Sequence, residues 1–297
     1  MNYENESTRW WLLQVQLPAR HGKQQSLFSK PMPRSELFRE AIKIIPETIR
    51  ISRGSSTWGF ANLNEVSSDL YSLYLTIRPP KAHIAEEPEP GHLQDTKDPR
   101  YYTLCVVNIP NQIIMVHKGS DVSRFARSAK TFSEIFQELF DKAIAVLQMK
   151  DHYIVEVDPI AQTGSFIDWV RNQDTLQKII IKYTGANLPS GASNLISNIR
   201  ESAKKYQNAL KSKDVELVAN EPELNDEEIE ELDEAAADRR LKLRAKGTKA
   251  GVGTTWSSSK KPIPETAQML ISEEILSDES YVAERINLYI NNRFADR

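Results

Sequence analysis

Apolar and polar side chains alternate with a period of two along several segments in the first half of the chain. Residues 10–17 end in an alternation of leucine and valine with glutamine, which predicts a half-buried strand that Pro18 terminates. Two further strands are predicted at 57–63 and 70–78, and two β-rich runs over 101–117 meet at a Pro-Asn pair. The first half therefore predicts a sheet that contains a hairpin.

The hydrophobic period changes to that of a helix after Lys130. Apolar residues then recur three and four positions apart, at Phe132, Ile135, Phe136, Leu139, Phe140, Ala143, Ile144 and Leu147. Because a stripe this broad must be covered, we expect this helix to pack on the core. A shorter helix is predicted from Ser35 to about Ile45, and proline-containing loops are predicted at 18–34 and 79–99.

Strands and helices alternate in the second half of the chain. Strands are predicted at 153–157, 176–183 and 215–219, and helices at 165–172, 193–210 and from Asn225 onward. The run Ile179-Ile180-Ile181 predicts a strand that is buried on both faces. A strand, a glycine-bounded turn over 247–251 and a second strand predict a hairpin over 239–256. Two helical patterns follow, at about 264–276 and 279–292.

Together these patterns predict an α+β protein. A chain of 297 residues suits two domains or one large one, because a typical domain has roughly 100–200 residues. We expect an antiparallel-rich N-terminal α+β domain over 1–150 and a C-terminal domain over 151–260, built on a mixed, helix-covered α/β sheet. A C-terminal helical extension is expected over 261–297.

Composition places the chain among folded proteins without an internal disulfide. Hydrophobic content is 40% and the net charge is −3, which argues against a general polyanion binder but allows a local basic patch. Cys105 is the sole cysteine, and its apolar neighbours predict an inert buried thiol. No secretory signal begins the chain, and no apolar run approaches the ~18 residues of a membrane span. We therefore expect a cytoplasmic protein that does not associate with a membrane.

One predicted strand carries a run of cations on a single face. The period of two in residues 240–246 points Leu241, Leu243 and Ala245 at a core, so the exposed face holds Arg240, Lys242, Arg244 and Lys246. Trp256 lies on the predicted partner strand. A cationic sheet face near an aromatic residue suits a phosphate backbone and a stacked base. The sequence therefore predicts nucleic-acid binding by these four cations and Trp256.

Other interpretations of this strand remain open. The cations could form an ordinary solvated face. They could also be neutralised by the acidic helix just before them, because residues 221–234 contain nine acids. A different anionic partner would fit the same charge.

No self-sufficient catalytic or cofactor motif is present. Glu156 and Asp158 share one face near a strand end, where metal-dependent nucleases often keep acids, and Lys178 or Lys182 on the next strand could add a lysine. A simple turn after the strand explains the same residues. The five histidines are never two to four residues apart, and the glycine-rich segment 247–255 lacks the P-loop order. Neither a metal site nor a cofactor is therefore predicted.

Two stretches carry a resemblance to known sequences. They are Val155-Glu156-Val157-Asp158-Pro159-Ile160 with Ser165-Phe166-Ile167-Asp168-Trp169-Val170, and Leu241-Lys242-Leu243-Arg244-Ala245-Lys246-Gly247 after an acidic helix. Over residues 150–260 the chain resembles uncharacterised bacterial proteins of similar length from accessory or phage-defence gene neighbourhoods. The resemblance implies a biological setting and no activity, so it assigns no functional residue.

The sequence as a whole predicts a non-catalytic nucleic-acid-binding component of a bacterial accessory or anti-phage defence system. One alternative is a protein-interaction or assembly subunit of such a system. Its terminal helices would pack against another protein or another copy through Ile271, Ile275, Tyr281, Ile286 and Tyr289. Another alternative is a metal-dependent nuclease or toxin centred on Glu156 and Asp158. The expected partner is therefore DNA or RNA, another protein, or a second copy of the chain.

Overall fold

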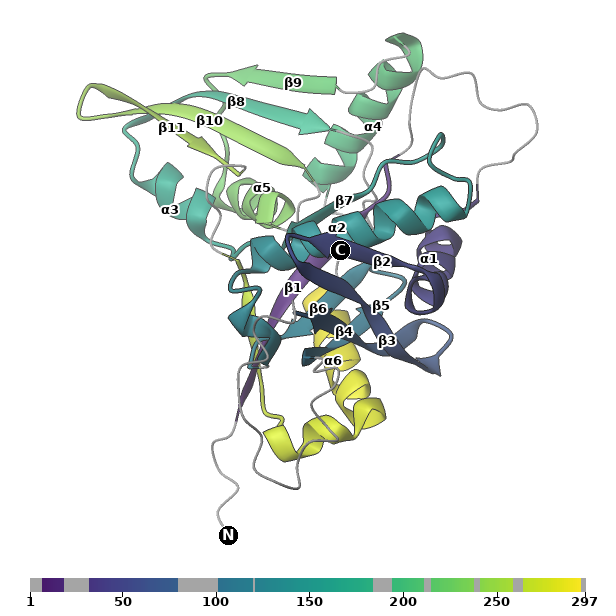
Figure 1. The fold of residues 1–297 in the computed structure, drawn as a ribbon. Helices are drawn as coiled ribbons and strands as arrows, with labels where there is room; N and C mark the ends of the chain where they lie inside the picture. Colours follow the sequence, from purple (N-terminus) through teal and green to yellow (C-terminus); the bar gives the residue numbers. More distant parts are fainter. Residues whose placement is uncertain are drawn as a thin grey trace, which may run out of the picture.

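Two antiparallel sheets with helices packed against them make up the protein, which confirms an α+β fold. The computed structural model describes residues 7–18, 32–79, 101–119, 121–183, 194–210, 215–237, 241–258 and 264–294. From residue 80 onward, the predicted loop at 79–99 lies outside these residues. Figure 1 shows the smaller sheet above the larger one, with helices between them.

The larger sheet has the strand order β12-β1-β6-β5-β4-β3-β2, and β7 also pairs with β1. Its strands are β1 (Thr8–Gln16), β2 (Arg50–Arg53), β3 (Ser56–Ser67), β4 (Leu70–Arg78), β5 (Tyr101–Asn108), β6 (Ile113–His117), β7 (Glu156–Pro159) and β12 (Thr266–Met269). All of these pairs are antiparallel. The first residues of β1 pair with β12 and its last residues with β7, so β1 joins distant parts of the chain.

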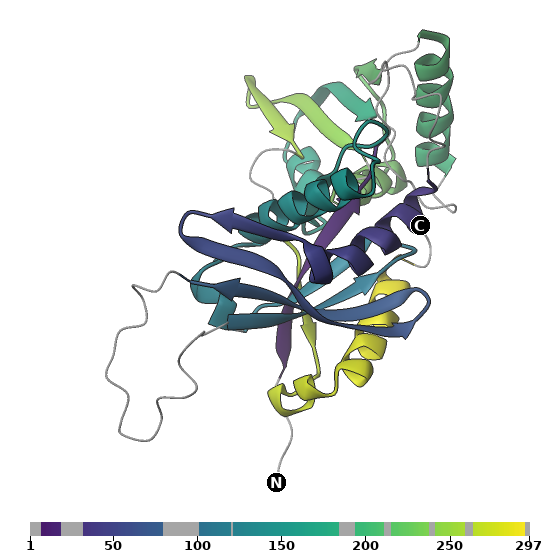
Figure 2. The ribbon, with the colours of Figure 1, turned by 45° about the vertical axis from the view of Figure 1, so that its right-hand side comes forward.

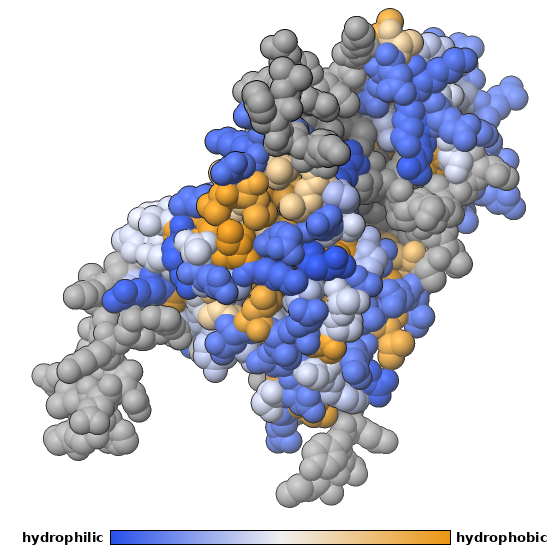
Figure 3. Space-filling view, turned by 90° about the vertical axis from the view of Figure 1, so that its right-hand side faces the viewer, coloured by the Kyte–Doolittle hydropathy of each residue, from blue (hydrophilic) through white to orange (hydrophobic). Residues whose placement is uncertain are grey.

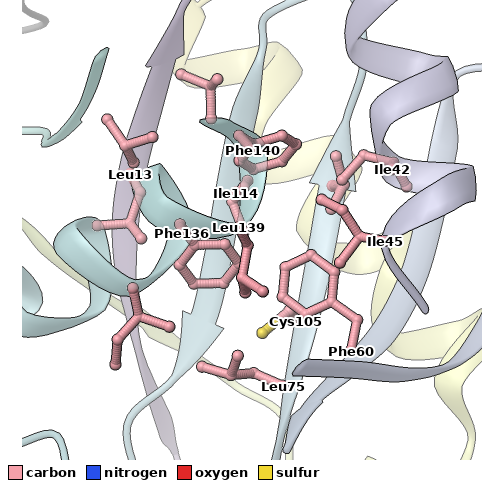
Figure 4. Close-up of a cluster of buried hydrophobic side chains, with 14 of the residues drawn as sticks. Leu13, Ile42, Ile45, Phe60, Leu75, Cys105, Ile114, Phe136, Leu139 and Phe140 are labelled. Carbon is pink, nitrogen blue, oxygen red and sulfur yellow. The ribbon is translucent and has the colours of Figure 1, made fainter. Parts of the chain in front are cut away.

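Two helices cover one face of the larger sheet. They are α1 (Arg34–Thr48) and α2 (Ala129–Val146), and the apolar stripe predicted after Lys130 is buried along α2. Aromatic rings of α2 pack on the sheet in the pairs Trp11–Phe132 and Phe60–Phe136, and Phe38–Phe140 joins α1 to α2, with centroid distances of 5.1–5.4 Å. Figure 4 shows the sulfur of Cys105 lying among the side chains of this core, close to Phe60 and Leu75. This layer is the main hydrophobic core.

The last helix covers the other face of the larger sheet, as Figure 2 shows. This helix is α6 (Glu279–Phe294), which buries Val282, Ile286 and Ile290 against β4 and β5. The helix predicted at 264–276 is wrong, because this segment forms β12 and the 3-10 turn η3 (Glu273–Ser277). The cause is the free edge of β1, whose backbone groups pair with β12 while Ala267 and Met269 enter the core. The described residues from 264 onward therefore pack with the first sheet.

The smaller sheet has the strand order β11-β10-β8-β9. Its strands are β8 (Thr175–Tyr183), β9 (Val215–Asn220), β10 (Lys242–Lys249) and β11 (Val252–Ser257), and all pairs are antiparallel. The expected mixed sheet is thus wrong in this detail. The helices α3 (Ser165–Arg171), α4 (Asn194–Leu210) and α5 (Asp226–Ala237) pack on one face only. Ile180 accordingly lies half-buried on the opposite face from Ile179 and Ile181, and the predicted burial of both faces is not observed.

Side-chain caps fix the helices beneath the smaller sheet. Asn225 caps α5 as predicted, since its side chain accepts from the Glu228 N–H at 2.9 Å and Glu228 reaches back to the Asn225 N–H at 3.0 Å. Asp233 of α5 is buried and accepts hydrogen bonds from the backbone N–H groups of Gly164 and Phe166 at the start of α3. These bonds tie α3 to α5, so the two helices support the sheet as a unit.

The surface of the described residues is mostly polar. Figure 3 shows hydrophilic side chains over most of the side that is turned toward the viewer, with hydrophobic residues gathered in separate patches. Among the helices that the structure describes, none combines the length and the apolar character needed to cross a membrane.

Candidate nucleic-acid interface

The face of the smaller sheet that points away from α3, α4 and α5 is called the open face here. Its position follows from the period of two, because Ile179, Ile181, Leu243 and Ala245 enter the helix-covered core and their neighbours point the other way. On the four strands the open face includes Lys178, Ile180, Lys182, Glu216, Val218, Asn220, Lys242, Arg244, Lys246, Thr255 and Ser257. In the part of the chain that the structure describes, no helix packs on this face (Figure 1).

Five cations gather on the two central strands of the open face. This cationic cluster consists of Lys178, Lys182, Lys242, Arg244 and Lys246. Lys242 lies directly opposite Lys182, and Lys246 lies directly opposite Lys178. Arg244 lies between these two pairs, opposite Ile180. Directly opposed residues have Cβ atoms roughly 4.5–5.5 Å apart, and like charges at that separation repel. The cluster is therefore a site of concentrated positive charge.

The exposure of the cluster differs between its two strands. Lys242, Arg244 and Lys246 of β10 are exposed, whereas Lys178 and Lys182 of β8 are partly buried. A lysine can lay its aliphatic stem along neighbouring side chains while the ammonium group stays in water. The five charges can therefore face one ligand even though their side chains are buried to different degrees.

The structure brings together only some of the residues that the sequence predicted for this site. Lys242, Arg244 and Lys246 share the open face as predicted, and Arg240 lies outside the described residues. Trp256 lies opposite Ala245 on the helix-covered face, where its ring centroid is 4.9 Å from that of Phe166. The tryptophan therefore packs with α3 and does not lie beside the cluster.

Sequence reasoning did not assign Lys178 and Lys182 to a nucleic-acid site. Both lysines were considered only as additions to a catalytic site, whereas the structure pairs their strand with β10. The available signal was the spacing in Lys178-Ile179-Ile180-Ile181-Lys182, which places both lysines on one face of a strand. Which strand lies next to them could not be read from that pattern.

The acidic helix lies on the other side of the smaller sheet. α5 contains most of the nine acids in 221–234, and it packs on the covered face through Leu232, Ala235 and Ala236. On the open face itself, the described strand residues include one acid, Glu216, which lies opposite Lys182 at the β9 edge. The packing therefore does not lay α5 across the cationic cluster.

Glu156 and Asp158 lie on β7 in the larger sheet. They are half-buried and lie opposite Gln16 and Gln14 of β1. β8, which carries the candidate lysines, belongs to the other sheet and pairs with β9 and β10. Among the described residues, no group of three or more His, Cys, Asp or Glu side chains is arranged to hold a metal ion. In the described part of the chain, the two acids therefore have no third acid arranged with them for a metal, and the candidate lysines lie on a strand of the other sheet.

Cys105 is buried in the main core, as its apolar neighbours predicted. Burial raises the pKa of its thiol from 9.0 to about 12, because the thiolate would lose its hydration. Near neutral pH the side chain is therefore a protonated, poorly nucleophilic thiol.

Most of the C-terminal residues predicted to bind a partner are buried or hydrogen-bonded within the chain itself. Ile271 and Ile286 are buried in the core between α6 and the larger sheet. The Tyr289 hydroxyl donates a hydrogen bond to Glu265 at 3.0 Å. Ile275 and Tyr281 remain 40% and 39% exposed. A partner would therefore meet only a small apolar area at these positions.

Comparison with known proteins does not place the chain in a family. No protein-family model matches it, and no curated protein matches it either.

Proposed function

We propose that this protein is a non-catalytic nucleic-acid-binding protein whose open face contacts the phosphate backbone. One observation carries the proposal, namely the two lysine–lysine pairs that flank Arg244 across β8 and β10. Like charges in directly opposed positions destabilise a sheet, so their repetition on a face that no described helix covers favours an anionic ligand. A phosphate backbone carries a row of negative charges, so it can contact several of these cations at once.

The dimensions of the cluster support this ligand. Residues four apart on one strand are separated by roughly 13 Å, and neighbouring strands by about 4.8 Å. The cluster therefore forms a compact patch on two central strands, which are held in place by β9 and β11. A single small anion would meet one or two of these charges, whereas a polyanion can meet all five. Because the chain has a net charge of −3, such attraction is local to this face.

The biological setting of this binding is a further part of the proposal. The resemblance of residues 150–260 to bacterial accessory and phage-defence proteins supports a role as a binding component of such a system. The separation of Glu156 and Asp158 from the lysines of β8 supports a role without cleavage. Binding without catalysis is what the open face can provide through its own side chains.

The proposal is tested by neutralising the exposed cations of β10. The variant Lys242→Gln/Arg244→Gln/Lys246→Gln removes three charges whose side chains point to solvent, so the fold should be retained. A matched control, Lys43→Gln/Lys130→Gln/Lys150→Gln, also removes three positive charges. These lysines lie in α1, in α2 and in the turn after α2, away from the open face. Binding to labelled DNA and RNA is measured over a range of salt concentrations, with and without magnesium.

We expect the native protein and the control to bind without cleaving, and the β10 variant to bind much more weakly. The salt dependence should also change, because each lost phosphate contact reduces the slope of log K against log[salt] by about 1. Equal binding by the β10 variant and the control would contradict the proposal. Absence of binding by the native protein at low salt would leave a protein partner as the ligand of this face.

A further inference from the structure

We infer that the open face binds double-stranded nucleic acid in preference to single strands, through the backbone and without reading the base sequence. The inference rests on the proposed function and narrows its ligand. It follows from which side chains the open face presents and from how rigidly they are held.

The described residues of the open face offer no ring on which a base could stack. These residues are cationic, aliphatic, hydroxyl, amide or acidic, and none is aromatic. Phe166, Trp169 and Trp256 pack together on the helix-covered side, where Tyr183 of β8 is also buried. Proteins that bind single strands gain about 1–3 kcal/mol per base from stacking on aromatic rings. The open face cannot supply that contribution to a flexible strand.

The backbone positions that carry the cations form a fixed array. They lie on two adjacent strands whose backbones are hydrogen-bonded along residues 178–182 and 242–246. A duplex presents a regular backbone with one charge per ~1.7 Å of helix axis, so it can meet a rigid array without being ordered first. A single strand would lose conformational entropy on binding such an array, with no stacking to compensate. The rigid array therefore favours the duplex.

Polar groups are distributed unevenly across the open face. At the β11 edge, Thr255 and Ser257 lie opposite Lys246 and Arg244, and hydroxyl groups are common donors to phosphate oxygens. At the β9 edge, Glu216 lies opposite Lys182, and Val218 beside it is 51% exposed. A backbone would be repelled by the carboxylate of Glu216. The expected footprint therefore covers β8, β10 and β11 and stops short of β9.

The test compares two base sequences, each as a duplex and as its separated strands. Short DNA and RNA duplexes of two unrelated sequences, and each of their separated strands, are titrated with the full-length protein at several salt concentrations. Fluorescence anisotropy of the labelled nucleic acid reports the binding. We expect each bound duplex to have a dissociation constant about tenfold lower than its separate strands, because only the strands lack a pre-ordered backbone. The two sequences should bind equally, and five contacts predict a salt slope of roughly −4.5 for DNA duplexes.

Each outcome separates the inference from the function on which it rests. Preference for duplex DNA, duplex RNA or both, with equal affinity for the two sequences, supports the inference and identifies which duplex is used. Equal or tighter binding of single strands, lost in the Lys242→Gln/Arg244→Gln/Lys246→Gln variant, overturns the inference and leaves nucleic-acid binding in place. Preference for one base sequence also overturns it. Binding of no form of nucleic acid overturns both proposals.

Discussion

Lys246 of β10 lies directly opposite Lys178 of β8, so two positive charges occupy one cross-strand pair on an exposed sheet face. A pair of opposite charges, or of threonines, would stabilise the same position. Local choices that oppose the stability of the fold are concentrated at functional sites. On the proposed function, the pair therefore links the stability of the smaller sheet to nucleic-acid binding.

Replacing Lys246 with threonine should stabilise the free protein and weaken its binding to nucleic acid. The free energy of unfolding should rise by about 0.5 kcal/mol, because the repulsion from Lys178 is removed and threonine suits a strand. Urea denaturation measures this change, and anisotropy measures the loss of affinity.

Lys249→Thr is the matched control for this prediction. Lys249 is an exposed lysine at the end of the same strand, and Val252 lies opposite it instead of a lysine. Its replacement should not raise stability. In the alanine series Lys178→Ala, Lys246→Ala and Lys178→Ala/Lys246→Ala, the double variant should be less stable than the sum of the two single changes predicts, because the repulsion can be removed only once and two alanines form no hydrogen bond across the pair. Additive effects would show that the two charges do not interact.

The individual strands of this site could be predicted from the sequence, but their pairing could not. The period of two identified 176–183 and 239–246 as strands and placed Lys242, Arg244 and Lys246 on one face. In the structure 58 residues, 184–241, separate β8 from β10, and the pattern of each strand is compatible with many neighbours. The lysine pairs arise only from the register between β8 and β10, which packing of α3, α4 and α5 determines.

The position of Trp256 depended on the length of one turn. A turn over 247–251 was expected, but β10 continues to Lys249 and the turn consists of Ala250 and Gly251, both with positive φ. Two-residue turns of this kind match the twist of paired strands. They also fix the register, which places Trp256 opposite Ala245 on the covered face. A longer turn would have left the face of the tryptophan undetermined.

Asp233 should be essential for the support of the smaller sheet. Its carboxylate accepts from the N–H of Phe166 at 2.7 Å and from that of Gly164, and the residue is 2% exposed. In Asp233→Ala both donors lose their partner, so the free energy of unfolding should fall by about 2 kcal/mol. Asp233→Asn keeps one acceptor oxygen and should cost less.

Chemical denaturation of these variants tests the cap. Glu230→Ala on the same helix serves as a control, because Glu230 is exposed and such surface changes usually remain within about 0.5 kcal/mol. If Asp233→Ala were as stable as Glu230→Ala, the two hydrogen bonds would not contribute to the stability of the fold.

Cys105 should contribute to the loss of stability in alkaline solution. Its folded-state pKa is raised from 9.0 to about 12 by burial, so above pH 9 the unfolded chain releases this proton while the folded chain keeps it. The free energy of unfolding should therefore fall as the pH rises from 9 toward 12. In Cys105→Ala the part of this fall that begins near pH 9 should be absent, whereas the part from buried tyrosines remains.

Denaturation at a series of pH values, for the native protein and Cys105→Ala, measures this contribution. In parallel, a thiol reagent at pH 8 should label Cys105 only as fast as the protein unfolds, because the thiol is buried. Rapid labelling of the folded protein would contradict both the burial and the raised pKa.

Glu216→Lys should increase the affinity for nucleic acid. Glu216 is exposed on β9 opposite Lys182, so the change removes a carboxylate and adds a cation at the edge of the cluster. We expect tighter binding and a salt slope steeper by about 1, since one more phosphate can be contacted. Salt-dependent anisotropy measures both quantities.

Glu227→Lys provides the control for the change in net charge. Glu227 is exposed in the first turn of α5, a helix packed against the covered face of the sheet. If both variants increased affinity equally, the effect would come from the overall charge of the protein and not from the open face.

Val218→Trp should give the open face the stacking surface that its described residues lack. Val218 is 51% exposed and lies opposite Ile180 of β8, which is one of the two strands that carry the cationic cluster. An indole there could stack on a base that is held near the cations. Because such stacking contributes about 1–3 kcal/mol, the affinity for single strands should rise roughly tenfold while the affinity for a duplex changes little. The preference for duplexes would then narrow or disappear.

Val252→Trp separates stacking on the open face from a general effect of an added tryptophan. Val252 is 65% exposed on β11, but its register opposite Lys249 places it with the covered-face side of the sheet. We expect this variant to bind single strands as weakly as the native protein does. If Val252→Trp improved single-strand binding as much as Val218→Trp, strands would bind beyond the open face. If neither variant improved it, base stacking would not be what limits single-strand binding, and the preference for duplexes would need another cause.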